Sequence, residues 1–163
     1  MNTVSIAIHG GAGTLVKGMM TSALEAAYRA HLKNALDQGY ALLENGGTAV
    51  DAVEKAVQVL EDSPLFNAGK GAVFTATGSH EMDASIMDGK TLNAGGVSLI
   101  TGVKNPVSLA KAIMEKSEHV FLAGEGAMQF AKELDYKLEE ASYFYDELRY
   151  KQWLEIKDTD SFQ

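Results

Sequence analysis

Residues 60–71, Leu-Glu-Asp-Ser-Pro-Leu-Phe-Asn-Ala-Gly-Lys-Gly, constrain the fold more than any other stretch of this sequence. They follow apolar residues at helical spacing and precede residues typical of a strand. Pro64 cannot donate the hydrogen bond that a continuing helix needs, and the two closing glycines allow backbone angles that other residues avoid. Leu65 and Phe66 lie inside this turn, so we expect it to be anchored on a core. Anchored irregular loops often carry functional residues.

A plain helix-to-strand connection is the alternative interpretation of this loop. It does not match the known phosphate-binding loops. Gly69-Lys70 is followed by Gly71 where a Walker-type loop needs Ser or Thr, and the residue three positions after Gly71 is Phe74 where a dinucleotide motif needs Gly. The loop therefore does not predict nucleotide binding.

The composition narrows the class of protein. The chain has 163 residues, 46% of them hydrophobic, which predicts one soluble globular domain. Its formal net charge of −8 argues against a nucleic-acid partner, because phosphates would be repelled. We expect no membrane segment and a cytoplasmic location, since no long apolar run and no signal-peptide pattern is present. The absence of cysteine excludes disulfides, thiolate metal sites and a cysteine nucleophile.

Hydrophobic periodicity and turn residues predict an α+β domain, in which most strands are grouped rather than alternating with helices. Residues 1–156 would form this domain, and 157–163 would form a polar C-terminal tail. The expected elements are a strand at 3–8, helices at 22–44 and 48–60, a β-hairpin of 72–75 with 81–87, a strand at 94–101, helices at 107–116 and 125–134, and a partly helical segment at 139–154.

A glycine cluster, His9-Gly-Gly-Ala-Gly13, directly follows the first predicted strand. Successive glycines let backbone N–H groups face a cavity, which can build an anion or oxyanion site. A flexible turn is an equally good interpretation. His9 could act as a base, but a histidine at a strand end more often hydrogen-bonds to backbone.

Asp83 is the unusual residue within the predicted hairpin, because a buried carboxylate needs hydrogen-bond donors. With His80, Glu81 and Asp88 it could form a metal site. Adjacent residues of a strand point to opposite faces, however, so we favour a role for Asp83 in fixing nearby backbone amides.

Several stretches, in a fixed order, carry a resemblance to a known family. They are 6–13 (IAIHGGAG), 47–54 (GTAVDAVE), 60–71, 81–89 (EMDASIMDG), 94–97 (AGGV), 104–110 (KNPVSLA), 114–120 (MEKSEHV) and 124–127 (GEGA). Through these stretches the chain resembles the N-terminal (α) subunit of plant-type (type III) L-asparaginases/isoaspartyl peptidases, which are N-terminal-nucleophile hydrolases. The resemblance extends to about Ala131, and the remainder, from Lys132, matches poorly, as expected of that family's variable linker.

The resemblance implies half of a four-layer αββα sandwich, completed by a separate β chain. In this family a precursor cleaves itself before a threonine, which becomes the first residue of the β chain. The free α-amino group then serves as the base for its own hydroxyl. The expected substrates are L-asparagine and β-aspartyl dipeptides, and the expected assembly is a dimer of αβ units. The family's Gly-Thr-Val-Gly-like cleavage sequence does not occur here, so the chain alone should be inactive.

The resemblance assigns supporting roles to residues of this chain. Asn67 would lie beside the nucleophile and orient a hydroxyl or water, and Gly10 and Gly11 would form a mobile loop by the active site. Backbone carbonyls of the 60–71 loop would bind a structural sodium ion, and no organic cofactor is expected. The carbonyls belong to Leu60, Glu61, Ser63, Phe66, Ala68 and Lys70.

Two other interpretations remain open. A glycosylasparaginase of the same superfamily would use similar chemistry, although the His9 loop and the Leu65–Gly69 segment look plant-type. A non-catalytic binding module could also descend from the same half-fold.

Overall fold

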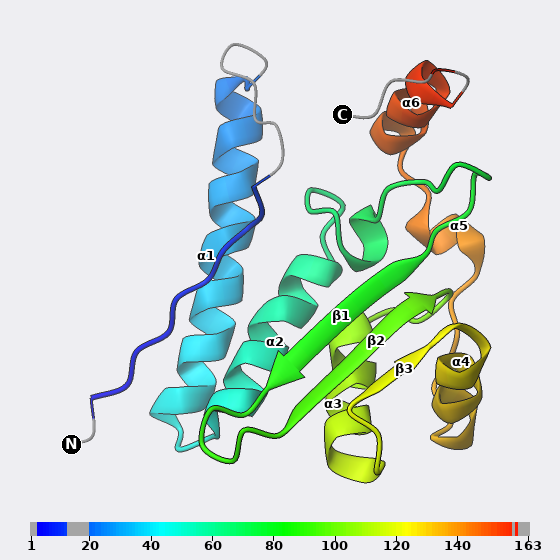
Figure 1. Cartoon of the computed structure of the whole chain (residues 1–163). Helices are drawn as coiled ribbons and strands as arrows, with labels where there is room; N and C mark the ends of the chain where they lie inside the picture. Colours follow the sequence, from blue (N-terminus) through cyan, green and yellow to red (C-terminus); the bar gives the residue numbers. More distant parts are fainter. Residues whose placement is uncertain (1–2, 13–19, 158, 160–163) are drawn as a thin grey trace.

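The computed structural model of the protein describes residues 3–12, 20–157 and 159. Figure 1 shows a small sheet with helices packed against one face and a pair of long helices beside it. The elements are α1 (Ser22–Glu44), α2 (Ala49–Glu61), a 3-10 turn η1 (Gly69–Gly71), β1 (Met82–Met87), β2 (Ala94–Ile100), α3 (Pro106–Lys116), β3 (Phe121–Ala123), α4 (Gly124–Glu133), α5 (Ala141–Phe144) and α6 (Glu147–Ile156).

These elements confirm the mixed helix and sheet composition predicted from the sequence. Within the described part of the chain, no helix is both long and apolar enough to cross a membrane. Most of the predicted tail at 157–163 lies outside the described residues.

The connection between α1 and α2 is fixed by local sequence. Gly46 has a φ of 81°, which suits glycine, and the Gly47 N–H donates to the Leu42 carbonyl at 2.8 Å to close α1. Thr48 then opens α2, because its Oγ1 accepts from the Asp51 N–H at 3.1 Å and donates to the Asp51 carboxylate at 2.7 Å. The predicted ends of both helices are confirmed.

The sheet has the order β1-β2-β3, with an antiparallel pair followed by a parallel pair. The parallel pair is possible because α3 carries the chain from β2 back to the start of β3. Gly95 of β2 lets α3 approach closely, since a Cβ there would lie 2.0 Å from the Ala110 carbonyl oxygen. The main core lies between this sheet and α3, with Val97, Ile100 and Ile113 almost fully buried.

Two predicted strands are wrong. Residues 3–8 alternate between exposed and half-buried positions along α1 and α2, but they pair with no strand of the described chain (Figure 1). Residues 72–75 also form no ladder, because the backbone N–H and carbonyl of Val73 form hydrogen bonds with side chains. Its N–H donates to Asn67 Oδ1 at 3.0 Å, and its carbonyl lies 3.3 Å from His80 Nδ1. The hairpin partner of β1 is β2 instead.

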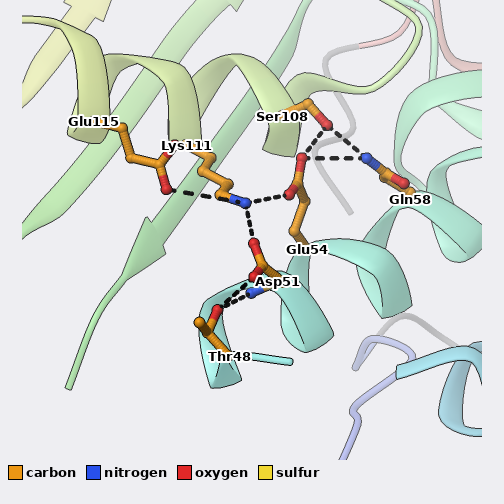
Figure 2. Close-up of polar contacts among 7 residues, drawn as sticks. All are labelled: Thr48, Asp51, Glu54, Gln58, Ser108, Lys111 and Glu115. Carbon is orange, nitrogen blue, oxygen red and sulfur yellow. Dashed lines mark hydrogen bonds and ion pairs between the residues drawn. The ribbon is translucent and has the colours of Figure 1, made fainter. Parts of the chain in front are cut away.

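A polar cluster joins α2 to α3, and Figure 2 shows its members pointing toward one another. Lys111 of α3 bonds to the carboxylates of Asp51 and Glu54 of α2, the latter at 2.8 Å. Ser108 donates to Glu54 at 2.7 Å and accepts from Gln58 at 2.8 Å. Burial opposes the charge on Lys111, but the hydrogen bonds that Lys111 donates to the two carboxylates outweigh this effect and raise its pKa. Lys111 therefore remains charged in the packed interface.

We expect Lys111→Met to destabilise the full-length protein by about 2 kcal/mol, because it leaves two carboxylates without their cation in a partly buried site. Lys33→Met is the matched control, since Lys33 pairs with Asp37 on an exposed surface of α1. It should cost about 0.5 kcal/mol or less. Urea unfolding measures both values, and equal losses would contradict a special role for the cluster.

Candidate functional site

The loop after α2 folds back against the last turn of that helix. Gly69 has a φ of 52°, and a Cβ there would lie 2.4 Å from the Glu61 carbonyl oxygen. At Gly71, a Cβ would lie 2.1 Å from the Phe66 carbonyl oxygen and 2.7 Å from that of Pro64. Only glycine fits at these two positions, and the close approach gathers several backbone carbonyls in one small region.

Asn67 lies exposed on this loop, with one end of its amide already bound. Its Oδ1 accepts from the Val73 N–H at 3.0 Å. A backbone N–H needs an acceptor, so the oxygen of the amide faces Val73 and the NH₂ group faces away. The sequence suggested an amide that could both donate and accept. In the structure its outward end is a donor.

The glycine segment predicted as part of the site lies against the same loop. A Cβ on Gly10 would lie 3.1 Å from the Phe66 ring and 2.9 Å from Leu32 of α1. Gly11 has a φ of 110°, and its N–H donates to His9 Nδ1 at 3.1 Å. This bond confirms that His9 hydrogen-bonds to backbone. Gly10 lies next to Phe66, the residue that precedes Asn67. Gly13 lies outside the described residues.

The backbone oxygens of the loop fit a hard cation. Carbonyl oxygens suit such ions, and each carbonyl has two lone pairs. Three of the predicted ligand carbonyls accept hydrogen bonds within the loop: Leu60 from Ser63, Phe66 from Ala68, and Ala68 from Gly71. Phe66 and Ala68 each keep one lone pair for an ion, whereas the Leu60 carbonyl also accepts from the Asp62 N–H. The chain can pass this close to the Glu61 and Phe66 carbonyls because Gly69 and Gly71 have no side chain.

The side-chain metal site considered for His80, Glu81, Asp83 and Asp88 is not assembled. The residues at 3–12, 20–157 and 159 contain no group of three His, Asp or Glu side chains that could hold an ion. Asp83 Oδ1 instead accepts from the Ser98 hydroxyl at 2.5 Å and from the Leu99 N–H at 2.9 Å, which lowers its pKa. These bonds confirm the expected role of Asp83 in fixing backbone.

Glu61, at the start of the loop, has a buried side chain that the sequence did not lead us to expect. It is 2% exposed, and its Oε1 accepts from the Val107 N–H at 3.0 Å, at the start of α3. Burial raises its pKa to about 7, despite the bond from Val107 and one from Asn105 that favour the charge. Oε2 has no partner among the described residues. Its place four residues after Val57, on an apolar face of α2, could have indicated its burial.

We expect the pH dependence of stability to change in Glu61→Gln. The folded-state pKa of Glu61, about 7, lies above its ordinary value of 4.5. The contribution of protonated Glu61 to the free energy of unfolding is therefore fully present below about pH 4.5 and is lost as the pH rises through about 7. The loss should approach about 3 kcal/mol.

Glutamine keeps an acceptor for Val107 and cannot ionise. The variant should therefore show a flatter stability profile between pH 4.5 and 8 in urea unfolding. Parallel profiles of wild type and variant would contradict the burial of an ionisable Glu61.

The asparaginase family model matches residues 1–163. The chain is 47% identical to a plant-type L-asparaginase of Pyrococcus abyssi over 95% of its own length and 48% of that protein. It is 44% identical to an isoaspartyl peptidase of Escherichia coli over 94% of this chain and 48% of the relative. An isoaspartyl peptidase/L-asparaginase of Xenopus laevis is 51% identical over 78% of this chain and 40% of that relative. The chain thus spans about half the length of these relatives.

Proposed function

Because this chain belongs to the asparaginase family, we propose that it is the N-terminal (α) part of an enzyme that hydrolyses the side-chain amide of L-asparagine and of β-aspartyl dipeptides. The observation that supports this proposal best is the exposed Asn67, whose Oδ1 is bound by the Val73 N–H, directly after Phe66, whose ring lies against Gly10. The relatives named above are L-asparaginases and isoaspartyl peptidases, and each is about twice the length matched here.

We propose that the nucleophile is an N-terminal threonine of a β chain released from the same precursor. Its hydroxyl would attack the amide carbonyl, its α-amino group would take the hydroxyl proton, and the amine would leave with that proton. Water would then hydrolyse the acyl-enzyme ester. The part of this chain would be to place the Asn67 Nδ2 donors at that hydroxyl or water, and to form one wall of the site with Gly10 and Gly11.

We propose that the β chain covers the free face of the sheet and completes a four-layer αββα sandwich. Helix α3 packs on one face of β1 and β2, which the Ile86 side chain faces. On the opposite face Met87 is 55% exposed and Phe121 is 58% exposed, with its ring against Gly96. Residues 3–8, which have a strand-like alternation and no ladder partner in the described chain, would pair with the same β chain. Two αβ units would form the mature enzyme.

We expect Asn67→Ala to lower kcat of the assembled enzyme by about tenfold or more, because a positioned donor beside the reacting groups would be lost. Asn34→Ala is the matched control, since Asn34 lies exposed on α1. Hydrolysis of L-asparagine and of a β-aspartyl dipeptide provides the measurement. Wild-type kinetics in Asn67→Ala would contradict the proposed role, and no hydrolysis by the wild type would contradict the proposed function.

We propose that the carbonyls of Leu60, Glu61, Ser63, Phe66, Ala68 and Lys70 bind a structural sodium ion. When bound, the ion would hold the loop that carries Asn67 in one conformation.

We expect NaCl to raise the melting temperature of the assembled protein above its value in choline chloride at equal ionic strength. EDTA should have no effect. Gly69→Ala should abolish this sodium response, because its methyl group would lie 2.4 Å from the Glu61 carbonyl oxygen and force the loop out of this conformation. Gly46→Ala is the matched control, since Gly46 also has a positive φ but no atom near its Cβ position. An equal response in both variants would contradict the site.

A further inference from the structure

The Leu65–Phe66 peptide, directly before Asn67, is bound by a side chain of α1. Tyr28 of α1 donates its hydroxyl to the Leu65 carbonyl at 2.9 Å. The Tyr28 ring also lies edge-on to the Phe66 ring, with centroids 5.6 Å apart and planes at 84°. One side chain therefore contacts both residues that lead into Asn67.

This pair of rings lies in a second, smaller core, apart from the core under the sheet. Ala35, Leu60 and Phe66 are its buried members. Phe66, which is 5% exposed, also limits the space at Gly10. A shift of the Phe66 ring would thus move both the glycine segment and the backbone of Asn67.

Two side chains donate to the Leu65 carbonyl, and the hydrogen bond from the Tyr28 hydroxyl is the shorter one. The other donor is Arg149 of α6, whose Nη2 lies 3.5 Å away, at the limit of a hydrogen bond. Arg149 also donates to Gln152 at 3.1 Å, so its guanidinium is shared. The Tyr28 bond therefore contributes most to fixing the plane of the Leu65–Phe66 peptide.

We propose that Tyr28 is a positioning residue for the reaction. Its hydroxyl fixes the Leu65 carbonyl, and through that peptide it sets the direction in which Asn67 presents its NH₂ group. This inference rests on the proposed role of Asn67 in the hydrolysis.

Tyr28→Phe tests the inference in the assembled enzyme, because it removes the hydroxyl and keeps the ring that packs on Phe66. We expect kcat to fall about three- to tenfold, the effect of one neutral hydrogen bond, with KM nearly unchanged. Tyr40→Phe is the matched control on the same helix, with a side chain 38% exposed, and it should retain wild-type kcat.

A double-mutant cycle distinguishes positioning from a general loss of packing. In the Asn67→Ala background, Tyr28→Phe should change kcat by less than about twofold, because the group that it positions is absent. A full three- to tenfold loss in that background would overturn the inference while leaving the role of Asn67 intact.

A crystal structure of the Tyr28→Phe enzyme gives a readout that does not depend on activity. We expect the Leu65 carbonyl to rotate and the Asn67 NH₂ group to be displaced or to occupy two positions. If both keep their wild-type positions, the inference is wrong. If the wild type hydrolyses neither substrate, the proposed function fails, and if Asn67→Ala is fully active, the proposed role of Asn67 fails. In either case this structure still decides whether Tyr28 orients the loop.

Discussion

The buried bond between the Glu61 carboxylate and the Val107 N–H is the contact on which the rest of the structure depends. It links residues that are 46 positions apart and joins the end of α2 to the start of α3. The next residue continues this junction, because Asp62 accepts from Lys104 at 3.2 Å and from Asn105 at 3.1 Å. Two consecutive acids thus hold the residues that open α3. The Lys111 cluster joins the same two helices about one turn further along α3 and about two turns earlier on α2.

This junction gives the 60–71 loop a rigid base. From Glu61 the chain leaves α2, and the two glycines let it turn back onto the carbonyl of the same residue. Phe66 fills the small core on α1, and the Tyr28 hydroxyl binds the carbonyl of Leu65. These contacts therefore fix the conformation of the loop, although it has almost no regular secondary structure. Asn67 lies at its exposed surface with its oxygen bound and its NH₂ group outward.

Features set by neighbouring residues could be predicted from the sequence. Thr21, Thr48 and Gly46 define helix ends through bonds within a few positions, and these ends were located correctly. A strand needs a partner, however, and the alternation of residues 3–8 does not say whether one is present in the same chain. The burial of the Glu61 side chain was missed for a related reason, since its donor comes from α3. The site residues Gly10 and Asn67 were suggested by family motifs, and their neighbourhood depends on Phe66, whose packing is tertiary.

We propose that this chain is one half of a hydrolase and that a second chain, which carries the nucleophile, completes it. The most direct test is intact mass spectrometry, with N-terminal sequencing, of the protein purified after expression of the full-length reading frame. We predict two polypeptides in equal amounts: one that contains this chain, and one whose first residue is threonine. A single uncleaved polypeptide that hydrolyses L-asparagine or a β-aspartyl dipeptide would contradict this proposal, as would a second chain that begins with any other residue.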